Sequence, residues 1–302
     1  MPYSNGVLLV LLVLGAVAWK ITTSRRTVAP APLPPGPPAD PIIGHVRVVP
    51  TDRPEVCYQK WGKEFKSDVL YLNLMGQPLI ILNSAQAAID LMDKRSSIYS
   101  DRPPLPMYEE AGWKDCVVFM STGPPFRKHR KMFQTAFASS NTAQYRIKQE
   151  SLAPPLMSQI LQKPGDWREH LWRYASSIVL AIAYGFQVTD DNDPWVILTK
   201  RMSYFFENGG PPGATLVDVI PLLRRLPTWV KIFPSLNYAR DNYALSREFY
   251  EEPFAEVKRR IESGTPNVSF VRRMLEEMES TSPSGDASDI TEDDIKGAAS
   301  SM

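Results

Sequence analysis

The feature that most restricts how this sequence can fold is an unbroken apolar run at residues 6–19, just before the first charged side chain, Lys20. With its flanks, residues 1–23, the run has about the length that a helix needs to cross a bilayer. Positive charges follow the run instead of preceding it, which is unlike a cleaved signal peptide and places the later residues on the cytosolic side. We therefore predict an uncleaved transmembrane anchor at residues 1–23. The alternative is a signal peptide with Ala16-Val17-Ala18 as its cleavage site.

Proline dominates the segment after the anchor. The chain has 28 prolines against 16 glycines, and residues 24–41 read SRRTVAPAPLPPGPPADP. Because proline fixes φ and is excluded from helix interiors, this segment is expected to be a stiff, extended hinge. Residues 42–302 would then form the folded domain. Hydrophobic residues make up 43% of the chain, enough for a sizeable core, and 34 basic against 33 acidic residues do not indicate nucleic-acid binding.

The cysteines and histidines exclude two classes of site. Cys57 and Cys116 are too few for a disulfide framework and form no Cys-x-x-Cys motif. His45, His129 and His170 are far apart in the sequence, so no spacing indicates a zinc site held by protein side chains. We expect a reducing compartment and no protein-ligated metal.

Strand signals are confined to a short stretch, and helix signals occupy most of the rest. Residues 69–74 and 79–82 are rich in β-branched and apolar residues and flank Met75-Gly76-Gln77-Pro78, which predicts a hairpin. Ser84 is placed to cap a helix that runs to about Lys94. Nearly everything after residue 124 favours helix. The predicted fold class is therefore mainly α with a small β-sheet (α+β).

Three of the later segments are distinctive. Residues 167–187 are apolar on all sides in their second half, which predicts a buried core helix. Residues 216–233 are apolar but interrupted by two prolines. Residues 242–262 predict an amphipathic helix with basic residues near its C-terminal end, where they suit the helix dipole. A polar loop is expected at residues 280–288.

The last residues predict the start of another helix. Thr291 to Asp294 form a capping-box-like start with acids in the first turn. Four apolar or small residues then share one face: Ile295, Ala298, Ala299 and Met302. The sequence stops about three turns into this helix without a C-terminal signal, and we interpret this as truncation.

One segment carries residues with possible binding chemistry. Residues 123–137 read GPPFRKHRKMFQTAF, and the two prolines suit a helix start. Helical periodicity places Phe126, Phe133 and Phe137 on one face, which Arg130 and His129 flank on opposite sides. A cation beside an aromatic face needs an anion nearby, and arginine suits a bidentate carboxylate. The residues alone leave three readings open: a ligand carboxylate, an ion pair with an acidic residue of another helix, or a stem that snorkels to solvent, with His129 as an ordinary satisfied polar residue.

The same segment resembles the C-helix of cytochromes P450, where a W-x-x-x-R motif places an arginine on a heme propionate. The pattern here is Phe126-x-x-x-Arg130, so phenylalanine replaces the tryptophan and its hydrogen bond to the propionate is lost. The resemblance implies that Arg130 binds heme, with Phe126 in the place of the tryptophan. His129 and Arg130 also resemble the H-R pair common in that helix.

Other segments resemble this family in the right order. The anchor and the prolines at 34–37 resemble microsomal members, and the predicted hairpin is similar to their first sheet. Residues 99–103 look like the segment before the B–C loop, which implies that Arg102 also approaches a propionate. Residues 104–120 would be that loop, and the resemblance implies that three of its side chains line the substrate pocket: Trp113, Val117 and Phe119. Residues 119–123 are similar to an F-M-x-Y-G of fungal members, with Thr122 in place of tyrosine.

Residues 216–233 resemble the apolar F–G region that dips into the membrane in this family. This implies membrane contact by Leu216, Trp229 and Phe233. Without the resemblance, an ordinary buried loop is an equally good interpretation.

The resemblance implies a fungal microsomal cytochrome P450 fold that is truncated near the start of the I-helix. The activity would be that of a heme- and iron-dependent monooxygenase, an oxidoreductase that acts on paired donors and inserts oxygen from dioxygen into a small apolar organic substrate. Its electron donor would be an NADPH-cytochrome reductase. Its location would be the endoplasmic reticulum membrane, single-pass, with the domain on the cytosolic side. A role in fungal secondary metabolism or xenobiotic oxidation is analogy.

The family's catalytic parts are absent from this sequence. We find no acid–alcohol pair of the I-helix, no E-x-x-R and no F-x-x-G-x-R-x-C-x-G loop, so this chain has no catalytic residue and no thiolate ligand for the heme iron. We therefore expect the chain as given to be inactive. Two alternatives remain: a truncated, membrane-anchored fragment that is inactive or binds apolar ligands without iron, and a helical tether.

Overall fold

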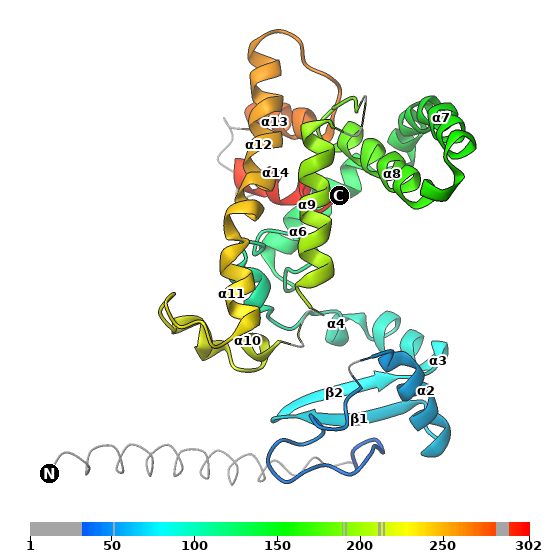
Figure 1. Cartoon of the computed structure of the whole chain (residues 1–302), viewed down its shortest axis with the longest axis vertical. Helices are drawn as coiled ribbons and strands as arrows, with labels where there is room; N and C mark the ends of the chain where they lie inside the picture. The colour runs from blue at the N-terminus through cyan, green and yellow to red at the C-terminus, as the bar shows by residue number, and fades with distance from the viewer. Residues whose placement is uncertain are drawn as a thin grey trace, which may run out of the picture. The chain divides into compact units, whose positions relative to one another are not determined.

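The structure, a computed structural model, describes residues 32–50, 52–188, 190, 192–210, 213, 215–281 and 290–302 (Figure 1). The predicted anchor at 1–23, the first part of the hinge and nearly all of the predicted polar loop at 280–288 lie outside these residues. Within the described part of the chain, no helix is both long enough and apolar enough to cross a membrane.

The chain divides into two compact units, residues 1–99 and 100–302. The first unit contains the only sheet of the described residues, in which β1 (Val69–Leu74) pairs antiparallel with β2 (Gln77–Leu82). The hairpin prediction is confirmed, but its turn is shorter than expected. Met75 and Gly76 both have positive φ and make the turn alone, so Gln77 and Pro78 already belong to the second strand.

Short helices complete this unit: α2 (Pro54–Glu64), α3 (Ala85–Ala88), η1 (Ile89–Asp93) and α4 (Ser96–Tyr99). Ser84 caps α3 as predicted, because its hydroxyl accepts a hydrogen bond from the Ala87 backbone N–H at 3.1 Å. The helix expected to run to Lys94 continues through the π-helical turn η1.

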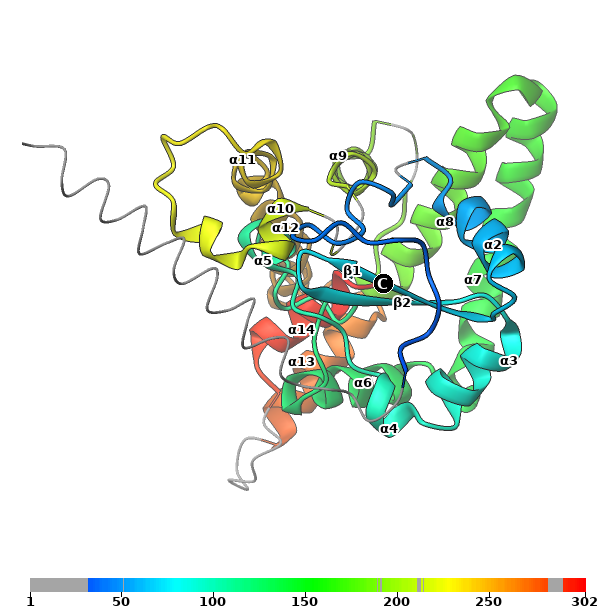
Figure 2. The same cartoon turned by 90° about the horizontal axis from the view of Figure 1, so that it is seen from below.

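The second unit contains helices and connecting loops but no strand in its described residues. Its elements, in order, are α5 (Pro106–Glu110), α6 (Pro124–Ala136), α7 (Ser139–Gln162), η2 (Pro164–Asp166), α8 (Trp167–Ala183), α9 (Pro194–Asn208), α10 (Leu216–Val219), η3 (Pro221–Arg225), α11 (Pro234–Asp241), α12 (Tyr243–Glu262), α13 (Phe270–Thr281) and α14 (Glu292–Ala299). Helices α9 and α12 lie side by side, as the two views of Figures 1 and 2 show. The mainly helical fold with a small sheet is thus confirmed.

Most predicted helix boundaries hold, and the exceptions have local causes. Helix α8 ends at Ala183 instead of continuing to residue 187, because Gly185 with φ +74° turns the chain away. The prolines Pro221 and Pro227 break the segment after α10 as expected. The capping box at Thr291 is present, since Thr291 and Asp294 cap each other's backbone at the start of α14.

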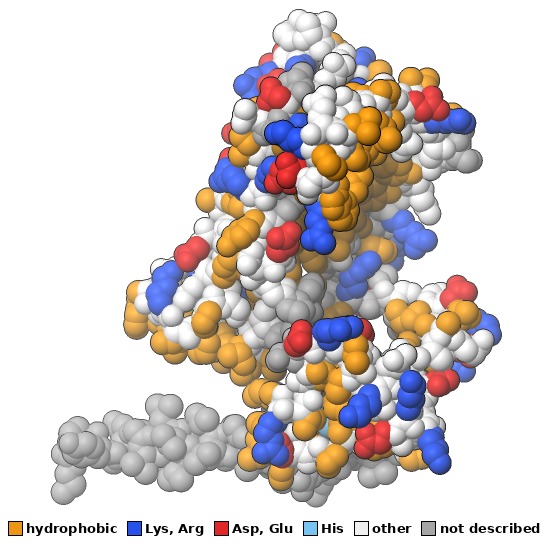
Figure 3. All heavy atoms as spheres, turned by 45° about the vertical axis from the view of Figure 1, so that its right-hand side comes forward, with side chains coloured by type: hydrophobic (Ala, Val, Ile, Leu, Met, Phe, Trp, Pro, Cys, Tyr) orange, Lys and Arg blue, Asp and Glu red, His pale blue; other side chains and the backbone are white. Residues whose placement is uncertain are grey.

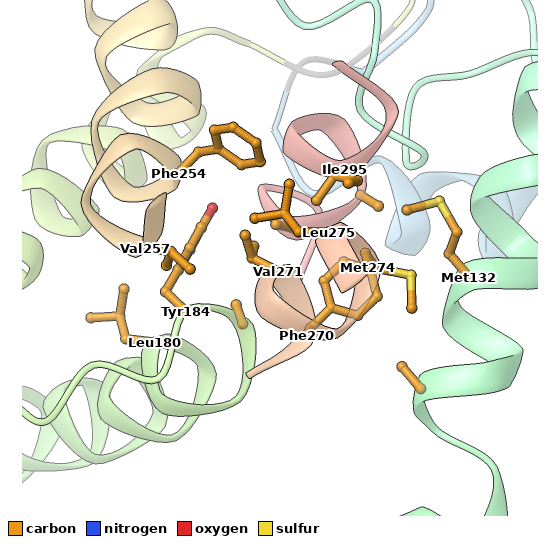
Figure 4. Close-up of a cluster of buried hydrophobic side chains, with 14 of the residues drawn as sticks. Met132, Leu180, Tyr184, Phe254, Val257, Phe270, Val271, Met274, Leu275 and Ile295 are labelled. Atoms are coloured by element: carbon orange, nitrogen blue, oxygen red, sulfur yellow. The ribbon is translucent and has the colours of Figure 1, made fainter. Parts of the chain in front are cut away.

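The first core of the unit forms where five helices meet. In Figure 4, apolar side chains point toward one another from α6, α8, α12, α13 and α14. The labelled residues are Met132, Leu180, Tyr184, Phe254, Val257, Phe270, Val271, Met274, Leu275 and Ile295. Helix α14 is therefore packed on α6 and α13 from its first turn, and Ile295 is fully buried.

Candidate functional site

Helix α6 buries a different face from the one that the sequence suggested. The buried side chains are His129, Met132 and Ala136, which lie about a quarter of a turn away from the phenylalanine face. Phe133 packs partly against the core, whereas Phe137 is 41% exposed. The expected aromatic core face is therefore corrected: it lies at the edge of the buried stripe, because α13 and α14 cover the neighbouring side of α6.

Arg102 lies against the start of α6. Its guanidinium carbon is 5.3 Å from the centre of the Phe126 ring, and Nη1 donates to the Met120 carbonyl oxygen at 3.3 Å. The Asp101 carboxylate accepts from the backbone N–H groups of Arg102 and Thr122, so the turn before the loop and its end are tied together. Those two backbone hydrogen bonds lower the pKa of Asp101. The structure thus brings two of the predicted residues, Arg102 and Phe126, into contact.

Arg130 lies one helical turn after Phe126 and is exposed. Within the described ranges, no carboxylate forms an ion pair with the guanidinium of Arg130 or of Arg102. The predicted ion pair of Arg130 with another helix is therefore not found there. Arg102 thus contacts the Phe126 ring, and the exposed Arg130 follows Phe126 by one helical turn.

His129 points to the other side of α6, toward α14. Its ring is 1% exposed, Nε2 lies 3.5 Å from Asp294 Oδ1, and Nδ1 has no partner among the described atoms. Burial lowers the pKa of His129, although the nearby Asp294 opposes this effect. His129 therefore packs as a neutral ring between two helices, and its predicted role in binding a cofactor is not tested by this arrangement.

Asp294 joins α6 to the start of α14. Its carboxylate accepts from Lys128 Nζ at 2.8 Å and from the Thr291 hydroxyl and backbone N–H at 2.7 and 2.9 Å. Burial alone would raise the pKa of Asp294, but these hydrogen bonds and the lysine charge outweigh it and hold the pKa below its usual range. Lys128 and Asp294 were not singled out as a pair by the sequence, although the capping box marked Asp294.

The burial of His129 gives a pH-dependent expectation. Because the pKa of His129 is lower in the folded chain than in the unfolded chain, the unfolded chain binds the extra proton first. The contribution of His129 to the free energy of unfolding should be fully present above about pH 6.5, the ordinary histidine pKa. Below this pH the free energy of unfolding should fall by up to about 1.4 kcal/mol per pH unit, until the ring also protonates in the folded chain. Urea unfolding between pH 7.5 and 5 measures this slope, which should be shallower in His129→Asn.

His170→Asn is the matched control. His170 is solvent-accessible, and in the described part of the chain its ring bonds to the Lys163 carbonyl oxygen alone. The slope should persist in this variant. An equal slope in His129→Asn and the unmodified chain would contradict the assignment to His129.

Helix α14 and the residues directly after it also contact the loop before α6. This contact was not predicted from the sequence. A Cβ on Gly297 would lie 2.3 Å from the Asp115 carbonyl oxygen and 3.0 Å from the His129 ring. One turn later, the Ser301 hydroxyl accepts from the Val117 backbone N–H at 3.0 Å. The two small residues were visible as part of a helix start, but their partners lie more than 150 positions away in the sequence.

The predicted pocket residues form a second core. Trp113 is 1% exposed and lies within an aromatic cluster, 5.2 Å from the Tyr250 ring and 4.9 Å from the Phe206 ring. The Phe119 ring stacks on Tyr108 at 4.3 Å. Val117 is half-buried. The loop before α6 thus packs its aromatic residues against α9 and α12.

The segment after α10 carries apolar side chains on its surface. Leu216, Leu222 and Trp229 are 51%, 65% and 79% exposed, while Phe233 packs partly against the second core. Hydrophobic side chains gather at the lower end of the helical unit in Figure 3, where α10 and the residues after it lie in Figure 1. Leu216 and Trp229 are therefore accessible and Phe233 is less so, while the membrane contact predicted for the three residues stays a prediction.

Charged side chains hold this segment to α5. Arg240 on α11 donates to Glu110 at 2.8 Å and to the carbonyl oxygens of Arg224 and Leu226. Arg224 itself pairs with Glu109 at 2.8 Å. The apolar surface segment and the aromatic loop are therefore attached to each other by ion pairs.

Comparison with known proteins points to one family. The profile described as Cytochrome P450 matches residues 34–302. The chain is 34% identical over 276 residues to Cytochrome P450 monooxygenase 98 of Postia placenta, which covers 91% of this chain and 52% of the relative. It is 38% identical over 251 residues to Cytochrome P450 monooxygenase claR of Ampulloclitocybe clavipes, covering 81% of this chain and 46% of the relative. It is 32% identical over 286 residues to Tryptamine 4-monooxygenase of Psilocybe cyanescens, covering 93% and 55%. The chain spans about half the length of these relatives.

Proposed function

This chain belongs to the cytochrome P450 family, and from that membership we propose that it supplies the N-terminal half of a fungal, heme-dependent monooxygenase. The whole protein would transfer one oxygen atom of dioxygen to a small apolar organic substrate, with electrons from an NADPH-cytochrome reductase. The proposal rests on the family and on one observation, the guanidinium group of Arg102 over the Phe126 ring, one helical turn before the exposed Arg130.

The residues present fit a heme edge. Heme carries two propionate groups, and Arg102 and Arg130 are two cations without an ion-pair partner in the described residues, the first over the Phe126 ring and the second one helical turn after it. Guanidinium groups suit carboxylates because they offer several donors in a plane. Arg102 is already oriented by its bond to the Met120 carbonyl oxygen, so less side-chain freedom is lost on binding.

Each residue would then have a distinct task. Heme iron with a thiolate ligand would supply the activation of dioxygen. Arg102 and Arg130 would hold the propionates, and the Phe126 ring would exclude water between them. Val117 and Phe119, which are only partly buried, would present apolar surface to the substrate, and Trp113 would support them from the second core. His129 would support the helix through α14 and not through direct contact.

Heme retention tests this proposal. In the full-length protein, Arg130→Ala should lower bound heme severalfold, because a charge-assisted contact is worth about 1.5–3 kcal/mol. Arg127→Ala is the matched control, since Arg127 is exposed on the same helix and points away from Phe126. The heme absorbance per protein is measured after gel filtration. Equal heme content in both variants would reject the propionate assignment.

We also propose that the protein is bound to the endoplasmic reticulum membrane with its domain on the cytosolic side. The support is the apolar run at 6–19 in the sequence and the exposed side chains between Leu216 and Trp229. Three exposed large apolar residues within one short segment are typical of a membrane or protein contact.

Binding to lipid vesicles tests the membrane contact proposed for the segment from Leu216 to Trp229. Deletion of residues 1–23 should reduce membrane association without abolishing it, and adding Leu216→Ser, Leu222→Ser and Trp229→Ser should remove most of the remainder. The control carries Ile147→Ser, Met157→Ser and Leu161→Ser, which replace three exposed apolar residues of α7. Co-sedimentation with phosphatidylcholine vesicles measures both. Equal losses in the two triple variants would contradict a specific membrane segment.

A further inference from the structure

We infer that Ser301 is a positioning residue that sets the ligand selectivity of the apolar pocket proposed around Val117 and Phe119. It would do so by holding the backbone of residues 115–117 against α14. This inference rests on the proposed function, because the pocket belongs to that proposal. The contacts that carry it lie entirely within the second unit.

The hydroxyl of Ser301 forms hydrogen bonds both to α14 and to the loop before α6. It donates to the Gly297 carbonyl oxygen at 2.6 Å, one helical turn earlier. A serine hydroxyl has a single proton, which Ser301 shares between the Gly297 carbonyl oxygen and the Cys116 Sγ at 3.3 Å, and its lone pairs accept from the Val117 backbone N–H at 3.0 Å. The loop backbone at Val117 is thereby bonded to a side chain that is itself hydrogen-bonded to the last turn of α14.

Gly297 provides the second attachment one turn away. The Asp115 carbonyl oxygen occupies the space that a Cβ on Gly297 would take, at 2.3 Å from that position. The loop therefore rests on α14 at Asp115 and is hydrogen-bonded to it at Val117. These two contacts fix both the position and the orientation of the peptide groups between Asp115 and Val117.

The position of the pocket residues follows from this anchored stretch. The Cys116 carbonyl oxygen accepts from the N–H groups of Phe119 and Met120, at 3.0 and 3.1 Å, so the next turn is built on the held peptide. The Phe119 ring then reaches its stacked place on Tyr108. Loss of the Ser301 hydroxyl would release the start of this turn and shift Val117 and Phe119 together, while Arg130 lies on α6, outside this turn.

Amide hydrogen exchange tests the anchor directly in the chain described here. Ser301→Ala should speed exchange at the Val117 amide by roughly tenfold, the equilibrium factor of one good hydrogen bond. Ser300→Ala is the matched control, because the Ser300 hydroxyl bonds to the Gly297 carbonyl oxygen and interacts with the Tyr250 hydroxyl, but makes no hydrogen bond to the backbone of residues 115–117 in the described contacts. Ser301→Thr keeps the hydroxyl and should restore slow exchange. Unchanged exchange in Ser301→Ala would overturn the anchor.

Selectivity is tested in the full-length protein by equilibrium dialysis with naphthalene and phenanthrene, two apolar probes of different size. The ratio of their dissociation constants should change at least about threefold in Ser301→Ala and stay unchanged in Ser300→Ala. Heme content is measured in the same samples and should be equal. Failure of every sample to bind heme would reject the proposed function alone, because dialysis and exchange need no heme. An unchanged ratio, or no binding of either probe, would overturn the role in selectivity.

Discussion

Replacement of Trp113 by alanine is expected to lower the free energy of unfolding by about 3–5 kcal/mol, the usual cost of truncating a buried tryptophan. Trp113 is 1% exposed and its ring lies near those of Phe206, Phe249 and Tyr250, from α9 and α12. Removal of the indole would leave a cavity that the rigid helices on two sides cannot close. The loss of buried apolar area and the loss of ring contacts would therefore both lower the free energy of unfolding. Urea unfolding of the chain, followed by far-ultraviolet circular dichroism, measures the change.

Two further variants make this result specific. Trp229→Ala removes an indole that is 79% exposed and should change the unfolding free energy by less than about 0.5 kcal/mol. Trp113→Phe keeps a ring in place and removes an indole N–H that has no partner among the described atoms, so its cost should be much smaller than that of alanine. If Trp113→Ala cost no more than Trp229→Ala, the aromatic cluster would not be a core.

The elements that the sequence predicts well are those with local causes. The hairpin at β1 and β2 follows from strand composition around Met75 and Gly76, and the start of α14 follows from the Thr291 capping box. The start of α6 follows in the same way from its two prolines. In each case neighbouring residues supply the whole signal, so no knowledge of the tertiary structure is needed.

The buried face of α6 could not be obtained in this way. Three phenylalanines outweigh one histidine in hydrophobicity, so periodicity points to the Phe126 face. The structure instead buries His129, because α14 approaches there and Asp294 and Gly297 accommodate the ring. These partners lie far along the chain, and a pattern confined to one helix contains no information about them.

The residues of the candidate site also differ in whether neighbouring residues alone were enough to predict them. Arg130 and Phe126 were found from their spacing, since both lie on one helix. Arg102 entered only through the family resemblance, because its contact with the Phe126 ring joins residues 24 positions apart. The contact of Ser301 with Val117 was not predicted, since a serine just after a short helix has no distinguishing pattern.

Gly297→Ala should be the most damaging small substitution in α14, with an expected loss of about 1–3 kcal/mol, the usual cost of overpacking. Alanine is normally the better helix former by about 1 kcal/mol, so intrinsic propensity alone predicts a gain. The added Cβ would lie 2.3 Å from the Asp115 backbone oxygen, a contact that no side-chain rotation can relieve. The loop and α14 must therefore separate, which also strains the bond between Ser301 and Val117.

Gly165→Ala is the matched control for this prediction, because a Cβ there meets no atom within 4 Å and the residue does not have positive φ. It should leave the unfolding midpoint in urea nearly unchanged, while Gly297→Ala lowers it clearly. Exchange at the Val117 amide should also rise in Gly297→Ala, since the Ser301 attachment follows Gly297 by only four residues and its hydroxyl bonds to the Gly297 carbonyl oxygen. A stabilised Gly297→Ala would mean that helix propensity prevails and that the loop does not rest on α14 at this point.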